Sequence, residues 1–231
     1  MAGGLGSRLG AITKHKPKPA ININGKPFIF YTMDWLIQNG FKEFIFLLSY
    51  KSEIIEELIS NYAADKEIKC AFYIDQERLG TLNAINNIKG KLSKFFFYTN
   101  ADEISNINIQ LMYSNFIESK SYVTSLLKKD ENGNLNIDGN VIKGKILNKK
   151  GSHIELGCKF INKEIFVFLD KDYEKFEDFL YEDLIYQTKV TCYISHLLPL
   201  RIDRASDIKK TKELLNNKIT TMMVPHNFLV T

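Results

Sequence analysis

The residues Phe44-Ile-Phe-Leu-Leu48 decide the fold class, since a short uninterrupted apolar run is typical of a strand that is covered on both faces. The run Phe95-Phe-Phe-Tyr98 has the same character. Between the two, Ser52 can cap a helix that carries apolar residues at helical spacing as far as Tyr62, and residues 68–74 are strand-like. Strands that alternate with helices predict a parallel sheet with helices on both faces.

The alternation continues on either side of this stretch. Pro27 is a favourable start for a helix that Gly40 ends, and residues 81–88 predict a short helix. The pairs Asn132-Gly133 and Asp138-Gly139 are hairpin signals, which predict an antiparallel meander. A helix, a strand and a helix are expected over residues 176–187, 190–195 and 206–216. We therefore expect an α/β three-layer sandwich with a mostly parallel central sheet.

The composition indicates one continuous globular domain over residues 1–231, because 45% of the residues are hydrophobic, 25% are charged and no linker is visible. The net charge of +4 comes mainly from dispersed lysines, which favours a small anionic substrate over nucleic acid. The three cysteines form no C-x-x-C pair, so we expect no disulfide framework. The apolar runs are too short to span a membrane, and the opening residues do not resemble a signal peptide. We expect a cytoplasmic protein that binds neither nucleic acid nor membrane.

The opening residues Ala2-Gly-Gly-Leu-Gly-Ser-Arg-Leu9 favour phosphate binding, since glycines let backbone N–H groups approach phosphate oxygens closely. Arg8 adds a forked cation, and Lys18 adds a point charge between two prolines. Taken singly, each can also be a solvated surface side chain, as we expect for Lys14 and Lys26. No Walker sequence is present, and Leu9 stands where a dinucleotide fingerprint needs its third glycine. The pattern therefore suits a triphosphate.

Four ordered sequence blocks resemble the sugar-1-phosphate nucleotidyltransferase family over about residues 2–105. The blocks are Gly4–Leu9 with Pro17–Pro19, Asn24–Phe28, Glu77–Thr81 and Thr99–Asp102. The resemblance implies a Rossmann-like nucleotide-diphospho-sugar transferase fold. It also implies an enzyme that transfers a nucleoside monophosphate from an NTP to a sugar 1-phosphate and releases pyrophosphate. Residues 1–105 would form the nucleotide-binding half and residues 106–218 the sugar-phosphate-binding half, with a tail over 219–231 of unknown role.

The resemblance implies catalytic roles for Arg8, Lys18 and Asp102 and a Mg²⁺ cofactor. Nucleotide contacts are expected from Ala2, Gly3, Gly4, Gly6, Ser7, Glu77, Gly80 and Thr81. Asp102 follows a buried strand, and ligands bind at the carboxyl ends of strands, so we expect its carboxylate to hold Mg²⁺; a turn residue is the alternative. Asp203 is the candidate for the second metal ligand, or else the N-cap of the following helix.

Sugar-phosphate contacts are expected from Glu155, Gly157 and Lys149 through the same resemblance. The segment His153–Cys158 is similar to the family's acid or Asn followed by Gly, whereas Asn148-Lys-Lys150 departs from its E-K-P. Glu155 is therefore either a ligand of sugar hydroxyls or an exposed acid on a strand.

The A-G-G opening and the E-x-L-G-T block look closest to the mannose- and heptose-1-phosphate guanylyltransferases. GTP is thus the expected nucleotide and a hexose or heptose 1-phosphate the expected acceptor, in nucleotide-sugar synthesis for surface polysaccharide. One alternative is a CTP-dependent cytidylyltransferase that acts on phosphocholine or a similar phosphate. The other is a catalytically silent regulatory subunit that binds nucleotide-sugars. The oligomeric state stays open.

In the resembling family an apolar strand leads directly into the glycine-rich turn, and here Met1 stands where that strand ends. We therefore expect that the first strand is missing from this chain. In the sheet it would lie between the strands over residues 44–48 and 95–98, where its loss leaves two strand edges without a partner.

Overall fold

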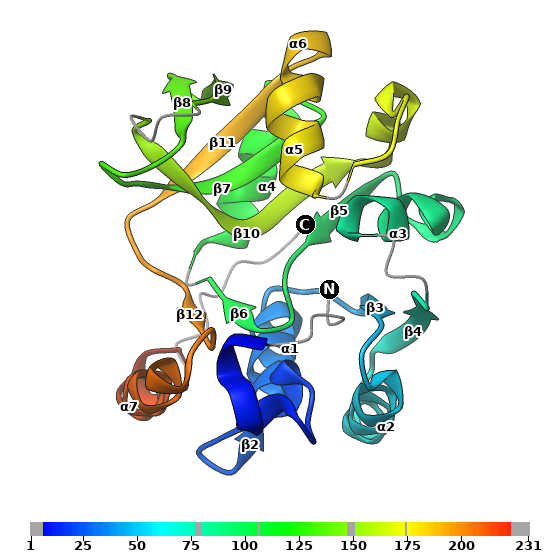
Figure 1. Cartoon of the computed structure of the whole chain (residues 1–231), viewed down its shortest axis with the longest axis vertical. Helices are drawn as coiled ribbons and strands as arrows, with labels where there is room; N and C mark the ends of the chain where they lie inside the picture. Colours follow the sequence, from blue (N-terminus) through cyan, green and yellow to red (C-terminus); the bar gives the residue numbers. More distant parts are fainter. Residues whose placement is uncertain (1–6, 77–79, 106, 147–150, 174, 223–231) are drawn as a thin grey trace. The chain divides into compact units, whose positions relative to one another are not determined.

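The computed structural model of the chain describes residues 7–76, 80–105, 107–146, 151–173 and 175–222 (Figure 1). The chain divides into two compact units, which are described separately. The small-sheet unit comprises residues 2–73, 101–104 and 200–231, and the large-sheet unit comprises residues 74–100 and 105–199. Both contain helices and strands, so the expected α/β class is confirmed.

In the small-sheet unit the strands pair two by two. The pairs are β1 (Asn22–Ile23) with β2 (Lys26–Pro27), β3 (Glu43–Leu48) with β4 (Lys69–Ile74), and β6 (Glu103–Ile104) with β12 (Leu200–Arg201). The helical elements are the 3-10 segments η1 (Ser7–Thr13) and η2 (Lys18–Ala20) and the α-helices α1 (Phe28–Gln38), α2 (Ser52–Ala63) and α7 (Ala205–Met222).

The two helices α1 and α2 form the core of this unit with β3. Helix α1 begins after Pro27 and ends before Gly40, as predicted; Gly40 has a φ of 90°, and its N–H bonds to the carbonyl of Ile37 at 2.9 Å. Helix α2 starts differently, because Ser52 is its first residue and Lys51, with a left-handed φ of 51°, takes the cap position. The predicted Ser52 cap is therefore wrong. The shared core consists of Ala20, Ile29, Met33, Phe46, Leu48, Ile55, Ile59 and Ala101.

The large-sheet unit is built on a six-stranded sheet with the order β5-β10-β7-β11-β9-β8. Its strands are β5 (Phe95–Tyr98), β7 (Val123–Lys129), β8 (Leu135–Asp138), β9 (Val141–Lys145), β10 (His153–Asn162) and β11 (Val190–Ser195). Its helical elements are α3 (Thr81–Asn87), η3 (Lys89–Lys91), α4 (Ile109–Ser119), η4 (Lys163–Phe168), α5 (Phe176–Phe179), the π-helical segment η5 (Leu180–Leu184) and α6 (Ile185–Gln187).

The predicted mostly parallel sheet differs from what these strands form. Strands β7 and β11 are parallel, but β10 runs antiparallel to both of its neighbours β5 and β7, and β8 pairs antiparallel with β9. The reason is the meander, because the predicted turn at Asp138-Gly139 joins β8 to β9 and tight turns reverse the chain. Strand β10 returns from this meander and inserts between β5 and β7. In the described chain β3 and β5 belong to different sheets.

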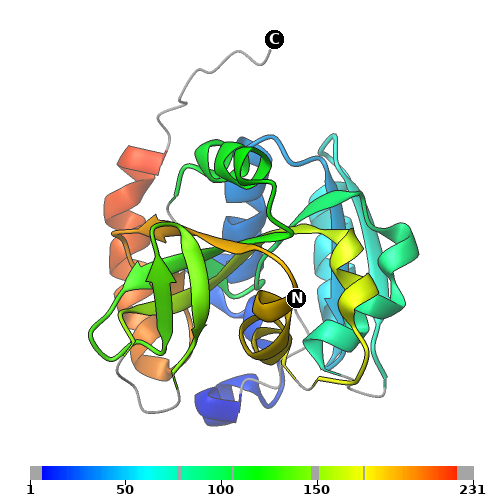
Figure 2. The same cartoon turned by 90° about the horizontal axis from the view of Figure 1, so that it is seen from above.

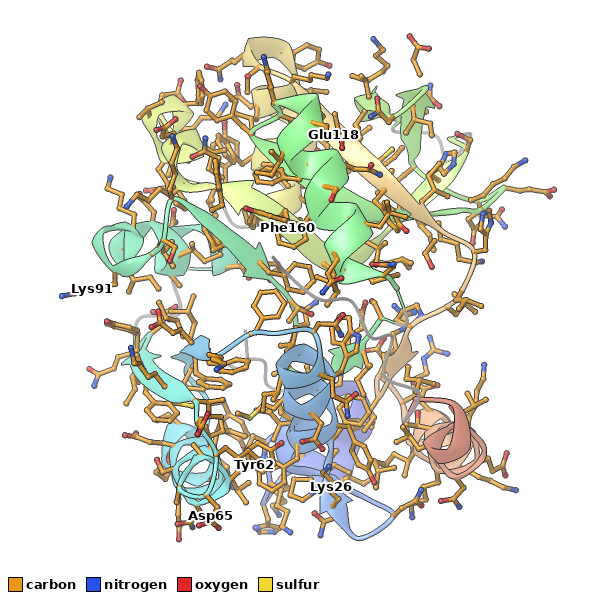
Figure 3. The ribbon with its side chains drawn as sticks, turned by 180° about the vertical axis from the view of Figure 1, so that it is seen from behind. Lys26, Tyr62, Asp65, Lys91, Glu118 and Phe160 are labelled. Atoms are coloured by element: carbon orange, nitrogen blue, oxygen red, sulfur yellow. The ribbon has the colours of Figure 1, made fainter. Side chains whose placement is uncertain are left out.

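Helices cover both faces of the six-stranded sheet. In Figure 2, α4 (green) and the helical residues 176–187 (gold) lie on opposite sides of the strands. Neighbouring residues of β10 follow this division, since successive side chains of a strand point to opposite faces. Phe160 stacks on Phe116 of α4 with ring centroids 5.8 Å apart, and Figure 3 shows it beside that helix. Lys159 faces the other side, where its Nζ lies 5.6 Å from the ring of Phe176.

Within the described residues, no helix combines the length and the apolar character that crossing a membrane requires.

Candidate active site

Two carboxylates and one lysine meet in the small-sheet unit. The Nζ of Lys18 lies 2.5 Å from Oδ2 of Asp102 and 2.6 Å from Oδ1 of Asp203. Three of the predicted site residues, far apart in the sequence, are thus brought into direct contact.

Strand pairing positions the two acids. Strands β6 and β12 run antiparallel, with Glu103 opposite Arg201. Asp102 precedes β6 and Asp203 follows β12, so both lie beyond the same end of this short ladder. The pairing of β6 with β12 therefore sets the spacing of two carboxylates that are far apart in the sequence.

A turn between two prolines positions the lysine. Pro17 has a φ of −65° and Pro19 is buried, and the N–H of Ala20 donates to the carbonyl of Pro17 at 2.9 Å. The backbone at Lys18 is thereby held, and its long side chain reaches both acids with 13% of its surface exposed. The side chains of Asp102 and Asp203 are 26% and 27% exposed, so the cluster is partly open to solvent.

The carboxylate of Asp207 accepts two backbone hydrogen bonds at the start of helix α7. The backbone N–H groups of Asp203 and Arg204 donate to Oδ2 of Asp207 at 2.9 and 2.7 Å, so the Asp207 carboxylate caps this turn. The carboxylate of Asp203 instead contacts two cations: Lys18 through Oδ1, and the Nε of Arg201 at 3.1 Å from Oδ2. The metal-ligand and N-cap interpretations of Asp203 both stay predictions.

The charges of the cluster stabilise the cationic lysine. Burial lowers the pKa of Lys18, but the Asp102 and Asp203 carboxylates outweigh this effect, so that the pKa lies above the ordinary value of 10.5. Lys18 is therefore an ammonium ion that neutralises part of the negative charge of the two acids.

The donor set fits Mg²⁺. Two carboxylate oxygens already face one cation, and Mg²⁺ is commonly bound by one or two carboxylates together with phosphate oxygens of a substrate. Among the described residues, no group of three or more His, Cys, Asp or Glu side chains that could hold a metal ion is found. The two carboxylates of Asp102 and Asp203 suit a metal ion that phosphate oxygens also bind.

Several predicted nucleotide and sugar ligands lie outside the described residues: Ala2, Gly3, Gly4, Gly6, Glu77 and Lys149. Ser7 and Arg8 begin the segment η1, and only their backbone is described. Gly80 and Thr81 belong to the large-sheet unit, where Gly80, with a φ of 83°, is the N-cap of α3 and Thr81 is its first residue. Their predicted contacts with the nucleotide stay predictions.

The predicted sugar ligands Glu155 and Gly157 lie at an irregularity of β10. The register against β7 shifts between Glu155 and Lys159, and Gly157 there has a left-handed φ of 45°. The shift accompanies an ion pair between Glu155 and Lys159, and both carboxylate oxygens of Glu155 are buried. The alternative of an exposed strand acid is therefore wrong for Glu155, while its contact with sugar hydroxyls stays a prediction.

Lys159 is the centre of a buried charged cluster that sequence reasoning missed. Its side chain is 0% exposed, and it pairs with Glu155 and, at 3.1 Å, with Glu177 of α5. The ring of Tyr98 lies 5.0 Å from its Nζ. Burial lowers the pKa of Lys159, but the carboxylates of Glu155 and Glu177 outweigh it, so the side chain stays protonated. A lysine between Cys158 and Phe160, inside the otherwise apolar run of residues 156–161, is the signal that could have found it.

Comparisons with known proteins identify relatives of this chain. A protein-family model described as Nucleotidyl transferase matches residues 1–135. A D-glycero-alpha-D-manno-heptose 1-phosphate guanylyltransferase of Campylobacter jejuni is 33% identical over 79% of this chain and 84% of its own length. The protein of that name from Aneurinibacillus thermoaerophilus is 30% identical over 95% of this chain and 98% of its own length.

A solved structure is similar over nearly the whole chain. The crystal structure of HddC from Yersinia pseudotuberculosis complexed with GMP-PN has a TM-score of 0.71 at 26% identity, and the match covers 93% of this chain and 96% of that one. The similarity to known proteins therefore extends over residues of both units.

Proposed function

Because the chain belongs to the nucleotidyl transferase family, we propose that it transfers GMP from GTP to a heptose or hexose 1-phosphate and releases pyrophosphate. It is a nucleotidyltransferase that makes a nucleotide-sugar from an NTP and a sugar 1-phosphate. The choice of guanine and of heptose is the proposed part, and the two guanylyltransferase relatives support it.

The observation that carries the proposal is the convergence of Lys18, Asp102 and Asp203. Phosphoryl chemistry of this kind needs charge neutralisation and alignment of the attacking and leaving oxygens rather than a covalent enzyme nucleophile. Clustered carboxylates with an adjacent ammonium group supply these requirements.

Asp102 and Asp203 are the residues that would hold Mg²⁺, which when bound neutralises charge on the phosphates. Lys18 and Arg8 bind the triphosphate and stabilise the negative charge on the departing pyrophosphate. The phosphate oxygen of the sugar 1-phosphate attacks the α-phosphorus of GTP, and the bond from that phosphorus to the pyrophosphate oxygen breaks. One P–O bond forms as another breaks, so no redox partner is required.

Pyrophosphate release tests the proposal when the chain is assayed with each of four NTPs against several acceptors. The acceptors are D-glycero-α-D-manno-heptose 1-phosphate, mannose 1-phosphate, glucose 1-phosphate and phosphocholine. We expect the highest kcat/KM for GTP with the heptose or mannose 1-phosphate. A preference for CTP with phosphocholine would make the chain a cytidylyltransferase. Nucleotide-sugar binding without turnover in every combination would make it a regulatory subunit.

A further inference from the structure

We propose that Lys18 is an internal counter-ion that a divalent metal ion displaces from Asp102 and Asp203. In the structure the ammonium group joins the two carboxylates, and on metal binding it turns away toward the phosphates of the nucleotide. The proposal deepens the function proposed above, since it concerns how the same site accepts its metal.

The first step of the argument is the position of the ammonium nitrogen. It lies 2.5 and 2.6 Å from oxygens of two different carboxylates, so both oxygens are directed at one point that a cation fills. Two carboxylates facing one point repel each other unless a cation lies between them. Lys18 therefore keeps the two acids together before a metal ion arrives.

The second step is that Lys18 can leave without dismantling the site. Asp203 keeps its contact with Arg201 through its other oxygen, at 3.1 Å. Asp102 adjoins β6, whose pairing with β12 does not involve the lysine side chain. The backbone at Lys18 is held between its flanking prolines, and its ammonium group ends a flexible four-carbon stem, so only this stem has to move.

The third step is that the ammonium group and a divalent cation cannot share the position. A metal ion coordinated by the same two oxygens would lie within a few ångströms of Nζ, where like charges repel strongly. The displaced ammonium group needs another anion, and a triphosphate supplies one. A metal ion alone must therefore compete with Lys18 for the two carboxylates. When a nucleotide binds with the metal ion, its phosphates give the displaced ammonium group a new anionic partner. The two ligands should thus bind with positive coupling.

Mn²⁺ binding to the full chain, measured by electron paramagnetic resonance without nucleotide, tests this directly. We expect Lys18→Met to bind Mn²⁺ about 10-fold more tightly than the wild type, a factor within the usual range of coupling between sites. The matched control is Lys16→Met, which removes the same charge from an exposed position in the same segment and should leave the affinity unchanged. The double variant Lys18→Met/Asp102→Asn should lose the gain.

Two results would overturn the proposal: Lys18→Met binds Mn²⁺ no more tightly than the wild type, or Lys16→Met gains as much affinity. If Lys18→Met does not fold, Lys18→Gln decides, because it also removes the charge between the two carboxylates and should bind Mn²⁺ more tightly than the wild type. Unchanged Mn²⁺ affinity in a folded Lys18→Gln variant would contradict displacement.

The Mn²⁺ titration requires no turnover, which separates this proposal from the proposed function. Tighter Mn²⁺ binding in Lys18→Met, together with no pyrophosphate release from any substrate pair, would support displacement of Lys18 and contradict the proposed reaction. If the wild type is active but Lys18→Met binds Mn²⁺ no more tightly than the wild type, only the displacement of Lys18 is contradicted.

Discussion

At the scale of single residues, the most specific prediction concerns the effect of substituting Asp102 on turnover. Asp102→Asn keeps the shape of the side chain but removes the charge that faces Lys18 and would hold the metal. We expect turnover to fall by at least ~100-fold, because charge stabilisation at a reacting phosphate is usually a term of several kcal/mol. Steady-state kinetics measure this, and circular dichroism should show a folded protein, since the side chain is partly exposed. Wild-type turnover in the folded variant would remove Asp102 from the site.

The lysines around the glycine-rich opening allow a charge-matched comparison. Lys18→Ala and Arg8→Ala should each lower kcat/KM by roughly 100-fold, because each removes a cation proposed to bind phosphate. Lys14→Ala removes the same charge from an exposed side chain and should leave kcat/KM within about 2-fold of the wild type. Equal losses in all three variants would mean that the positive charge acts diffusely.

Lys26 differs from the expected solvated side chain and is a poor second control. It is paired with Asp34 and lies 4.6 Å from the ring centre of Tyr31. Tyr62 also contacts Asp34, and Figure 3 labels both Lys26 and Tyr62. A substitution of Lys26 would therefore alter the packing of α1 and α2.

At the scale of elements, strand β10 contains a buried ion pair whose disruption should destabilise the protein. Lys159→Met leaves the buried carboxylate of Glu155 without its cationic partner. Removing one member of a buried pair typically costs about 3–5 kcal/mol, so urea unfolding should show a loss in that range. The double variant Lys159→Met/Glu155→Leu removes both charges and should recover most of the loss. A double variant as unstable as the single one would contradict this account.

Strand β10 also carries a pH-sensitive residue. Burial, followed by the charge of Lys129, lowers the pKa of His153 below the ordinary value of 6.5. His153 in the unfolded chain then binds a proton more readily than in the folded chain. The stability that neutral His153 contributes is therefore fully present above pH 6.5 and is lost as the pH falls below this value. Urea unfolding at pH 7.5 and 5.5 measures the difference. His153→Gln should reduce it, whereas His15→Gln, at an exposed position, should not.

At the scale of the whole molecule, ligand binding should raise the melting temperature selectively. A ligand at about 100 times its Kd stabilises the folded state by about 2.7 kcal/mol, because it binds the native chain and not the unfolded one. GTP with Mg²⁺ should therefore raise Tm by several degrees more than CTP, UTP or ATP at equal concentration. In Asp102→Asn the GTP shift should shrink. Equal shifts for the four nucleotides would contradict the proposed choice of guanine.

The local features of this protein could be predicted from its residues alone. The run Phe44–Leu48 lies in β3, and α1 lies between Pro27 and Gly40. The pair Asp138-Gly139 marks the turn between β8 and β9. The ordered motif blocks led to the right family, since residues 1–135 match it. These features depend on residues that are neighbours in the chain, so propensity and spacing are sufficient to predict them.

Contacts between distant segments could not be predicted in this way and are seen in the folded chain. The pairing of β6 with β12 brings Asp203 to Asp102, and the insertion of β10 next to β5 replaces the expected parallel sheet. The register shift in β10 places Lys159 against Glu155. The physical reason is that strand partners and register are selected by burial and hydrogen bonding over the whole sheet, and a segment's own sequence records little of this selection.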